Sequence, residues 1–243
     1  MATELAQPTV LRRTVAFAEA VTQGQITVEG ITACRVYTHI DMEQAFARGD
    51  VPVMVDADGV FLKAIHPTAL IEATLAKRNS GISINDAPIV IALGPGYEAG
   101  KDAHAVIETN RGHNLGRVYL QGCAEPNTGV PGMVGGYADE RLLRAPRAGL
   151  LYGVHHIGDQ VQAGETVAIV KDGAITASII AAIPGILRGL VRDGLPVQAD
   201  MKVGDIDPRA AREHCFTISD KSRAIAGGVL EAVMYFLQLQ GRP

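Results

Sequence analysis

The sequence predicts a mixed α/β fold made of an α/β layer domain, a small all-β module and a C-terminal helix. In the first half of the chain, short apolar runs alternate with helical patterns, which is typical of layered α/β domains. The pattern then changes to short strands separated by turns, which indicates an all-β module. The last segment carries apolar residues at helical spacing. We therefore expect three parts, over residues 1–138, 139–210 and 211–243.

The first part is predicted to be a Rossmann-like layer domain. Its clearest strand is the apolar run at 87–93, because a continuous apolar run suits a central parallel strand. Residues 67–78 are predicted to be a helix, since Pro67 stands near the start and apolar residues recur at helical spacing. The remaining expected elements are strands at 26–36, 51–55, 103–109 and 117–120, a helix at 41–48, and a long loop at 122–137.

The second part contains two segments that resemble each other, at 144–165 and 182–205. Each carries a Pro, a Gly shortly after it, an apolar pair and a turn of the G-x-x-V kind. This predicts a duplicated β-hairpin unit, which resembles the flattened barrel of biotinyl and lipoyl carrier domains. Such carriers attach a cofactor to a lysine on an exposed hairpin. Lys171 lies near that hairpin without the flanking signature, so a structural module is the favoured interpretation.

The third part is predicted to contain a helix over 217–240, in which Thr217 or Ser219 is the N-cap and Asp220 suits the first turn. Two glycines inside this helix, Gly227 and Gly228, lower its intrinsic stability. They suggest that a ligand or another segment of backbone approaches closely there.

Charge and composition exclude several classes of function. The 243 residues carry a net charge of −4 and are 47% hydrophobic, which argues against disorder and against a nucleic-acid-binding protein. Arginine outnumbers lysine, which fits an anionic small ligand. A GC-rich genome explains the same bias.

The expected location is the cytoplasm, without membrane contact. The N-terminal residues lack the apolar core of a signal peptide, and the apolar stretch at 174–187 is too short to cross a bilayer. The three cysteines form no CxxC pair, which favours a reducing compartment. No metal site is predicted, because the histidines show no metal-binding spacing.

The first segment with potential chemistry is GPGYEAGKD at 94–102, directly after the apolar strand. A phosphate-binding P-loop would need a different glycine spacing and a Ser or Thr after the lysine. A Gly-rich loop at the carboxyl end of a strand is nevertheless a common ligand site in open α/β sheets. The candidate ligand-binding residues are Gly94, Gly96, Gly100 and Lys101.

The second segment is ETNRGHNLGR at 108–117, at the end of the next strand. Arg111 and Arg117 are candidate anion-binding residues, since a guanidinium group matches carboxylate and phosphate geometry. His113 and Glu108 are candidate proton-transfer residues. A hydrogen-bonding surface role for His113 stays open.

The third segment contains Asp205, Asp207 and Arg209, and is followed by Cys215 before the predicted helix. A helix start lowers the pKa of a nearby thiol and favours anions, so Cys215 is a candidate nucleophile or chalcogen carrier. A small buried residue is the equally weighted alternative. Ser219 and Lys221 at the helix start complete the candidate ligand-binding set.

Several long segments are similar to the YqeB family, whose members are accessory proteins of selenium-dependent molybdenum hydroxylases. They cover nearly the whole chain: AKRN at 76–79, the stretch at 92–118, PNTGVPG at 126–132, ILRGLVRDG at 186–194, KVGDIDPR at 202–209, and the run from Cys215 to GGVLEA at 227–232. The resemblance implies a role in maturing a molybdenum enzyme of the xanthine dehydrogenase class. The handled group would be the molybdopterin-type cofactor or the selenium that becomes its terminal ligand.

Members of this family usually begin with a strand and a Gly-rich turn of the GxGDLxxG kind. This chain starts with MATELAQPTVLRR, which resembles the stretch after that unit. The sequence therefore predicts no dinucleotide pocket at that turn. An exposed sheet edge could then be covered by a second copy, which would make a homo-oligomer.

The leading hypothesis is a maturation factor for a molybdenum hydroxylase, with the apo-enzyme as partner. The loops at 94–102 and 108–117 and the helix start at 215–221 would converge on one site. Cys215 would carry sulfur or selenium in a transfer reaction. The residues expected to hold a phosphate, selenophosphate or molybdopterin phosphate are Arg111, Arg117 and Lys221. Two alternatives stay open: a non-catalytic chaperone or scaffold, and a metabolic enzyme acting on an anionic substrate.

Overall fold

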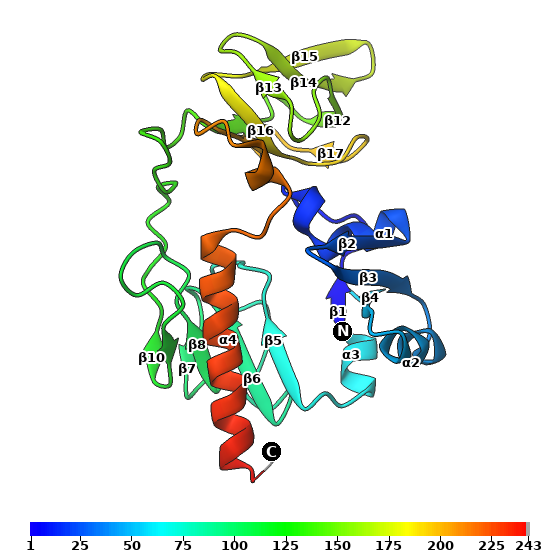
Figure 1. Ribbon diagram of the computed structural model, residues 1–243, viewed down its shortest axis with the longest axis vertical. Helices are drawn as coiled ribbons and strands as arrows, with labels where there is room; N and C mark the ends of the chain where they lie inside the picture. The colour runs from blue at the N-terminus through cyan, green and yellow to red at the C-terminus, as the bar shows by residue number, and fades with distance from the viewer. Residues whose placement is uncertain (242–243) are drawn as a thin grey trace. The chain divides into compact units, whose positions relative to one another are not determined.

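The computed structural model describes residues 1–241 and shows a mixed α/β protein with several sheets and a C-terminal helix (Figure 1). The chain forms two compact units, each discontinuous in sequence. Unit 1 contains Met1–Asp58 and Val130–Ile218, and unit 2 contains Gly59–Gly129 and the segment that starts at Ser219. The domain limits expected from composition, at residues 138 and 210, stay a prediction.

Unit 1 begins with a four-stranded sheet in the order β1-β4-β3-β2. Its strands are β1 (Ala2–Glu4), β4 (Val51–Val55), β3 (Ile31–Val36) and β2 (Gln25–Val28). The first three are parallel and β2 is antiparallel. The expected single strand at 26–36 is thus a hairpin, because Glu29 and Gly30 both adopt positive φ and form a tight turn.

Short helical segments accompany this sheet. They are η1 (Arg13–Val15), η2 (Phe17–Glu19), α1 (Ala20–Gln23) and α2 (His39–Ala47). Helix α2 confirms the helix expected at 41–48. It begins after Thr38, whose side chain accepts a hydrogen bond from the main-chain N–H of Asp41, while the Asp41 carboxylate accepts one from Thr38. This reciprocal capping fixes the start of α2.

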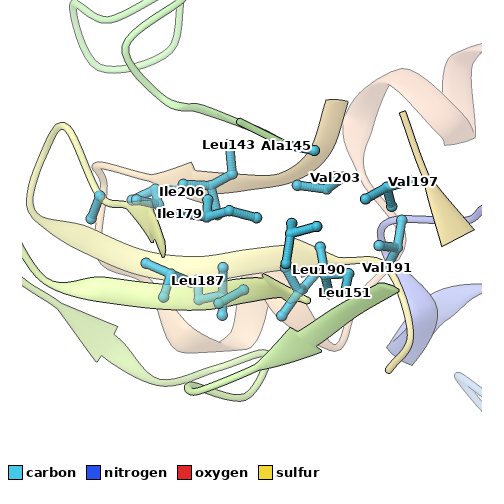
Figure 2. Close-up of a cluster of buried hydrophobic side chains, with 14 of the residues drawn as sticks. Leu143, Ala145, Leu151, Ile179, Leu187, Leu190, Val191, Val197, Val203 and Ile206 are labelled. Carbon is cyan, nitrogen blue, oxygen red and sulfur yellow. The ribbon is translucent and has the colours of Figure 1, made fainter. Parts of the chain in front are cut away.

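The second part of unit 1 consists of two four-stranded antiparallel sheets. One contains β11 (Leu142–Arg144), β18 (Lys202–Asp207), β16 (Gly185–Leu190) and β13 (Gln160–Val161). The other contains β15 (Ile175–Ile180), β14 (Thr166–Asp172), β12 (Gly149–Gly153) and β17 (Pro196–Val197). Figure 2 shows the buried side chains that the sheets share, among them Leu151, Leu187 and Ile206. The expected barrel is therefore not closed: the two sheets pack on one core but remain separate.

Two strand pairs of these sheets are alike, and the duplicated hairpin unit expected from the sequence stays a prediction. Leu150 on β12 pairs with Lys171 on β14, and Ile186 on β16 pairs with Asp207 on β18 in the same way. A Cβ atom placed on Gly149 would lie 2.5 Å from the carbonyl oxygen of Lys171. A Cβ atom placed on Gly185 would lie 2.5 Å from that of Asp207. The same close approach of two strands thus occurs twice.

Unit 2 contains a four-stranded sheet in the order β5-β6-β8-β9. Its strands are β5 (Ala69–Glu72), β6 (Ile89–Leu93), β8 (Ala105–Ile107) and β9 (Val118–Tyr119). The first three are parallel and β9 is antiparallel. The short strands β7 (Glu98–Ala99) and β10 (Gly122–Cys123) form a separate pair, and α3 (Val60–Ala64) precedes β5.

One face of this sheet is covered by α4 (Asp220–Leu239), as Figure 1 shows. Ile225 and Ala232 of α4 belong to the same buried cluster as Ile91 and Ile107 of the strands. The opposite face buries Tyr97 and a group of small apolar side chains from the following loops. Both faces of β6 are therefore buried, as the apolar run at 87–93 predicted.

The prediction of a helix at 67–78 is wrong. Residues 69–72 form β5, which pairs in parallel with β6, and residues 73–80 form a loop. Leu70 packs on one face of the sheet and Ile71 on the other, so their apolar side chains are buried by strand pairing rather than by a helical stripe.

The two glycines inside α4 have different surroundings. A Cβ atom on Gly228 would collide with the carbonyl oxygen of Gly116 and lie 3.0 Å from Ile107 Cγ2. Gly227 has no such neighbour within 4 Å. Of the two explanations left open by the sequence, the approach of another backbone segment is therefore the one found at Gly228.

This difference predicts opposite effects of neighbouring substitutions. Gly228→Ala should lower the free energy of unfolding by about 1–3 kcal/mol, because the helix must move away from Gly116. Gly227→Ala should raise it by about 1 kcal/mol through helix propensity. Urea denaturation of the two variants and the parent protein measures both effects. Equal behaviour of the two variants would show that α4 does not pack on Gly116 in this way.

Candidate functional site

The candidate site lies at the carboxyl edge of the parallel strands of unit 2. Strands β5, β6 and β8 run in the same direction, so the loops that follow them begin at one edge of the sheet. These loops are 73–80, Gly94–Gly96 and Glu108–Arg111. Ligands of open α/β sheets bind at such an edge.

The turn Gly94-Pro95-Gly96 is packed between the other two loops. A Cβ atom on Gly94 would lie 2.6 Å from Thr109 Oγ1, in the loop after β8. One on Gly96 would collide with the main chain of Arg78, in the loop after β5. The two predicted ligand-binding glycines therefore allow the three loops to approach each other.

The other two residues predicted in the first segment lie on a surface turn. The main-chain N–H of Gly100 donates to the carbonyl of Ala103, and Lys101 forms an exposed ion pair with Glu98 at 3.2 Å. The hydrogen bond from Lys101 to Glu98 raises the pKa of the lysine. Lys101 is thus already paired.

The loop after β5 is held by the carboxylate of Glu72. It accepts hydrogen bonds from the main-chain N–H of Thr74 at 2.8 Å and from Ser80 Oγ at 3.0 Å. Within this loop, Leu75 and Lys77 adopt φ values of 57° and 62°, which are unfavourable for residues with a side chain. Such backbone strain concentrates at functional sites.

Lys77 is not among the site residues predicted from the sequence, because the pattern at 67–78 predicts a helix. The AKRN motif at 76–79, which contributes to the family resemblance, is the signal that could have revealed it.

Glu108 is fully buried and serves as a hydrogen-bond acceptor. Its Oε1 accepts from the main-chain N–H groups of Thr109 and Asn110, both at 2.7 Å, and its Oε2 accepts from that of Glu125 at 2.8 Å. Three main-chain donors match an ionised carboxylate. The geometry of Glu108 therefore supports an ordering role for the loop after β8, and its proposed part in proton transfer stays a prediction.

The remaining polar residues of the second segment also have defined places. Arg111 forms a two-pronged ion pair with Asp220, the first residue of α4, with N–O distances of 2.7 and 3.1 Å. Arg117 donates to the side-chain oxygen of Asn114 at 2.9 Å. His113 is exposed. Of the three predicted binding or proton-transfer residues, Arg111 alone connects the loop to the start of α4.

Lys221 stands in the first turn of α4, after the N-cap Ser219, whose side chain accepts from the N–H of Ser222. It is half-buried, and its ammonium group forms no hydrogen bond or ion pair with residues 1–241. Burial lowers the pKa of Lys221, as do the charges of Arg111 and Lys77, while those of Glu108 and Asp220 raise it. The charges of Arg111 and Lys77 therefore both act on Lys221 at this edge of the sheet.

The remaining predicted site residues belong to unit 1. Asp207 is buried and paired with Arg209 at 2.6 Å, and Asp205 is paired with Arg141 at 3.3 Å. Burial alone would raise the pKa of Asp207, but hydrogen bonds from Arg209 outweigh it and the pKa is lowered. Both carboxylates therefore form ion pairs with arginines of their own unit.

The expected lowering of the Cys215 pKa is wrong. Cys215 lies in η3 (Arg212–Cys215), fully buried, with its thiol 3.7 Å from the carbonyl oxygen of Leu187. Burial raises the pKa of this thiol, and the positive charges of Arg12 and Arg188 oppose the rise only in part. The sequence predicts a helix start just after Cys215, but α4 begins five positions later, at Asp220. Cys215 also belongs to unit 1, so the candidate site is built from unit 2 residues alone.

Unit 2 is thus a mainly parallel sheet with loop-borne cations and a helix start at its carboxyl edge. A protein of Escherichia coli (strain K12) named YqeB is 47% identical over 234 residues, which is 96% of this chain. The chain belongs to the YqeB family, as the resemblance indicated. It spans 42% of the length of that relative. No family model matches the sequence.

Solved structures show only weak similarity. An aspartoacylase family protein from Mesorhizobium loti is 19% identical, over 28% of this chain and 23% of its own, with a TM-score of 0.26. A succinylglutamate desuccinylase from Silicibacter is 16% identical, over 57% of this chain and 51% of its own, also with a TM-score of 0.26. These scores are too low to support a shared fold or activity. Within residues 1–241, no helix has both the length and the apolar character needed to cross a bilayer.

The half-buried Lys221 predicts an unusual dependence of stability on pH. Because its folded-state pKa lies below the ordinary lysine value of 10.5, its charge costs stability at neutral pH. Lys221→Met should therefore be more stable than the parent protein at neutral pH. The difference should shrink as the pH rises towards 10.5, since the parent protein then releases the proton. Urea midpoints across this pH range measure the effect.

Lys101→Met is the matched control. The pKa of Lys101 is raised, so its charge contributes stability at neutral pH that is lost as the pH rises through the folded-state pKa. Removing it should give no gain at neutral pH. A Lys221→Met protein that behaves like Lys101→Met would contradict the electrostatic account of the site.

Proposed function

We propose that this chain binds a small molecule through a phosphate or similar anionic group at the carboxyl edge of the unit 2 sheet. The proposed setting is the cytoplasmic maturation of a selenium-dependent molybdenum hydroxylase. One observation carries the binding proposal: Lys221, a half-buried cation without an ionic partner among the described residues, directly follows Asp220, the partner of Arg111, in the first turn of α4. The maturation role rests on the family resemblance.

The position of Lys221 is costly for folding. A cation in the first turn of a helix meets the positive end of the helix dipole, and burial adds a desolvation penalty. Two further cations nearby increase the cost. A bound anion would offset all three unfavourable effects, so the arrangement is explained if the site holds a ligand for part of the protein's working cycle.

The surrounding groups suit a phosphate. The first main-chain N–H groups of α4, including that of Lys221, lack carbonyl partners within the helix and can donate to an anion. Gly94 and Gly96 bring no side chain of their own to the points where they meet Thr109 and Arg78. Arg111 is held by Asp220, so it would share its guanidinium group between that carboxylate and the ligand.

A molybdopterin-type cofactor would bind at this edge of the sheet through its phosphate. Lys221, Lys77 and Arg111 would hold that group, and the bound cofactor would supply the metal-binding dithiolene of the target enzyme. Chalcogen transfer fits less well, because the thiol of Cys215 is buried and its pKa is raised. We therefore propose no sulfur or selenium transfer through Cys215.

We also propose a Rossmann-like layer in unit 2 and a biotinyl- or lipoyl-like module in unit 1. The parallel strands of unit 2 with α4 on one face support a Rossmann-like description of that layer. The two sheets with their duplicated strand pairing support the comparison with biotinyl and lipoyl domains.

Native mass spectrometry of the protein purified from its own host tests the proposed function. We expect a bound phosphate-containing molecule in the parent protein, its loss in Lys221→Gln, and its retention in Lys101→Gln, because Lys101 is already paired with Glu98. Elemental analysis for molybdenum and phosphorus identifies the class of ligand.

The outcomes separate the alternatives. Bound molybdopterin supports the maturation role, whereas another phosphorylated metabolite would favour a metabolic enzyme. A hydroxylase subunit bound equally by all three proteins, with no small molecule, would replace the proposal with a scaffold role. The same masses also report whether the protein is a homo-oligomer.

A further inference from the structure

We propose that unit 1 holds a binding site of its own, which takes a small zwitterion with an apolar side chain, that is, an apolar α-amino acid. The site is an open cavity of about 340 Å³, lined by residues of η1, α1 and β2, of the turn at 155–159 and of the segment after η3. Cavities that hold small molecules measure about 300–1,000 Å³. All residues that line it belong to unit 1, whereas the proposed anion site belongs to unit 2.

The apolar side of the cavity is formed by Ile26, Ile157 and Phe216. The Phe216 ring lies against Gly158, where a Cβ atom would be 3.0 Å from Phe216 Cζ, and the Arg212 guanidinium group lies 5.0 Å from the ring centre. The ring is thus held in place although Phe216 is 40% exposed. An apolar ligand side chain would cover this surface and remove it from water.

Arg13 supplies the group that would bind the ligand carboxylate. Its Nε donates to the carbonyl of Leu190 on β16 at 2.8 Å, and its Nη1 lies 3.8 Å from Glu19 Oε2. The N–H groups on Nη1 and Nη2 donate no hydrogen bond to residues 1–241. They can therefore donate to a carboxylate in the paired geometry that a guanidinium group favours.

The main chain around Arg13 is fixed before any ligand binds. The neighbouring Arg12 donates from Nη2 to the main-chain carbonyls of His214 at 2.6 Å and Thr217 at 2.9 Å. Together with the bond from Arg13 to β16, these contacts tie η1 to the segment that carries Phe216. The polar and apolar sides of the cavity are thus preorganised, which lowers the entropic cost of binding.

Glu19 lies behind the polar side of the cavity, with its side chain only 3% exposed. Its Oε2 accepts from Gln23 Nε2 at 3.0 Å, while its Oε1 has no hydrogen-bond partner among the described residues. A buried carboxylate is costly unless a cation compensates it, and Arg13 does so only loosely, at 3.8 Å. The two opposite charges leave this side of the cavity without net charge. A dipolar ligand that is neutral overall suits it better than a simple anion.

Gln23 supplies the acceptor for the ligand ammonium group. Because a carboxylate only accepts hydrogen bonds, the amide nitrogen of Gln23 must face Glu19, and the amide oxygen is left as an acceptor. This oxygen forms no hydrogen bond with the described residues. The bond to the Glu19 carboxylate polarises the amide and makes its oxygen a stronger acceptor. Since Arg13 and Gln23 face the same oxygen of Glu19, they would hold a carboxylate and an ammonium group side by side, as an α-amino acid presents them.

An NMR titration of the isotope-labelled full chain tests the inference. The probes are L-phenylalanine, 3-phenylpropionate, which lacks the ammonium group, and phenethylamine, which lacks the carboxylate. We expect L-phenylalanine to cause saturable shifts of the main-chain amide signals of Arg13, Gln23 and Phe216. Each of the other two probes should bind about tenfold more weakly, which is the loss expected for one charged hydrogen bond.

Two results of this titration would overturn the inference. Without saturable shifts at these three residues, the cavity is not a binding site for this class of ligand. If 3-phenylpropionate binds as tightly as L-phenylalanine, the cavity is a simple anion site and the assignment to a zwitterion is wrong.

Variants locate the contacts. Arg13→Gln should weaken the binding of L-phenylalanine about tenfold. Arg144→Gln is the matched control and should leave it unchanged. Like Arg13, Arg144 donates to a main-chain carbonyl, at 3.0 Å, and forms a loose ion pair, at 3.7 Å, but it does not line the cavity.

A second variant keeps the test decisive if Arg13→Gln does not fold. Gln23→Met changes an exposed residue and removes the acceptor, so L-phenylalanine should then bind no more tightly than 3-phenylpropionate. An undiminished preference for L-phenylalanine in Gln23→Met would contradict the proposed contacts.

Discussion

The close approach of α4 to the loop after β8 is the constraint on which the rest of unit 2 depends. At Gly228 the helix backbone meets the carbonyl of Gly116, and a Cβ atom on Gly116 would lie 2.5 Å from the carbonyl oxygen of Ala224. Two glycines thus allow two backbones to pack directly. The same contact fixes the start of α4 at the carboxyl edge of the sheet, where Asp220 pairs with Arg111. Backbone packing therefore determines where the first turn of α4 presents Lys221.

The cations at this edge lower the stability of the folded protein and favour the binding of an anion. An uncompensated positive charge in the first turn of a helix costs free energy, and the strained φ of Lys77 adds to that cost. By contrast, two buried acids of unit 1 are paired with arginines: Asp207 with Arg209, and Asp205 with Arg141. Lys221 has no such partner among the described residues, and this is the strongest physical reason to place a ligand in unit 2.

Much of the fold could be predicted from local patterns. The apolar run of β6, the capped start of α2 and the long stripe of α4 are each determined by their own residues, and all three elements are present. The loop after β5 could not be predicted, because Leu70 and Ile71 are buried by pairing with a strand distant in sequence. The predicted pKa of Cys215 was wrong for a related reason. That pKa depends on burial of the thiol against β16, which no local motif encodes. Arg111 and Lys221 could be proposed as binding residues because charged residues at element ends are visible in a single sequence.

The most direct test of the central claim is the pKa of Lys221 itself, measured by NMR titration of the isotope-labelled lysine side chains, with Lys221→Arg to assign the signal. The account predicts that Lys221 titrates below the exposed lysines, and that added inorganic phosphate moves its pKa upwards, because a bound anion stabilises the ammonium form. A Lys221 signal that titrates together with that of Lys101 and does not respond to phosphate would contradict the account.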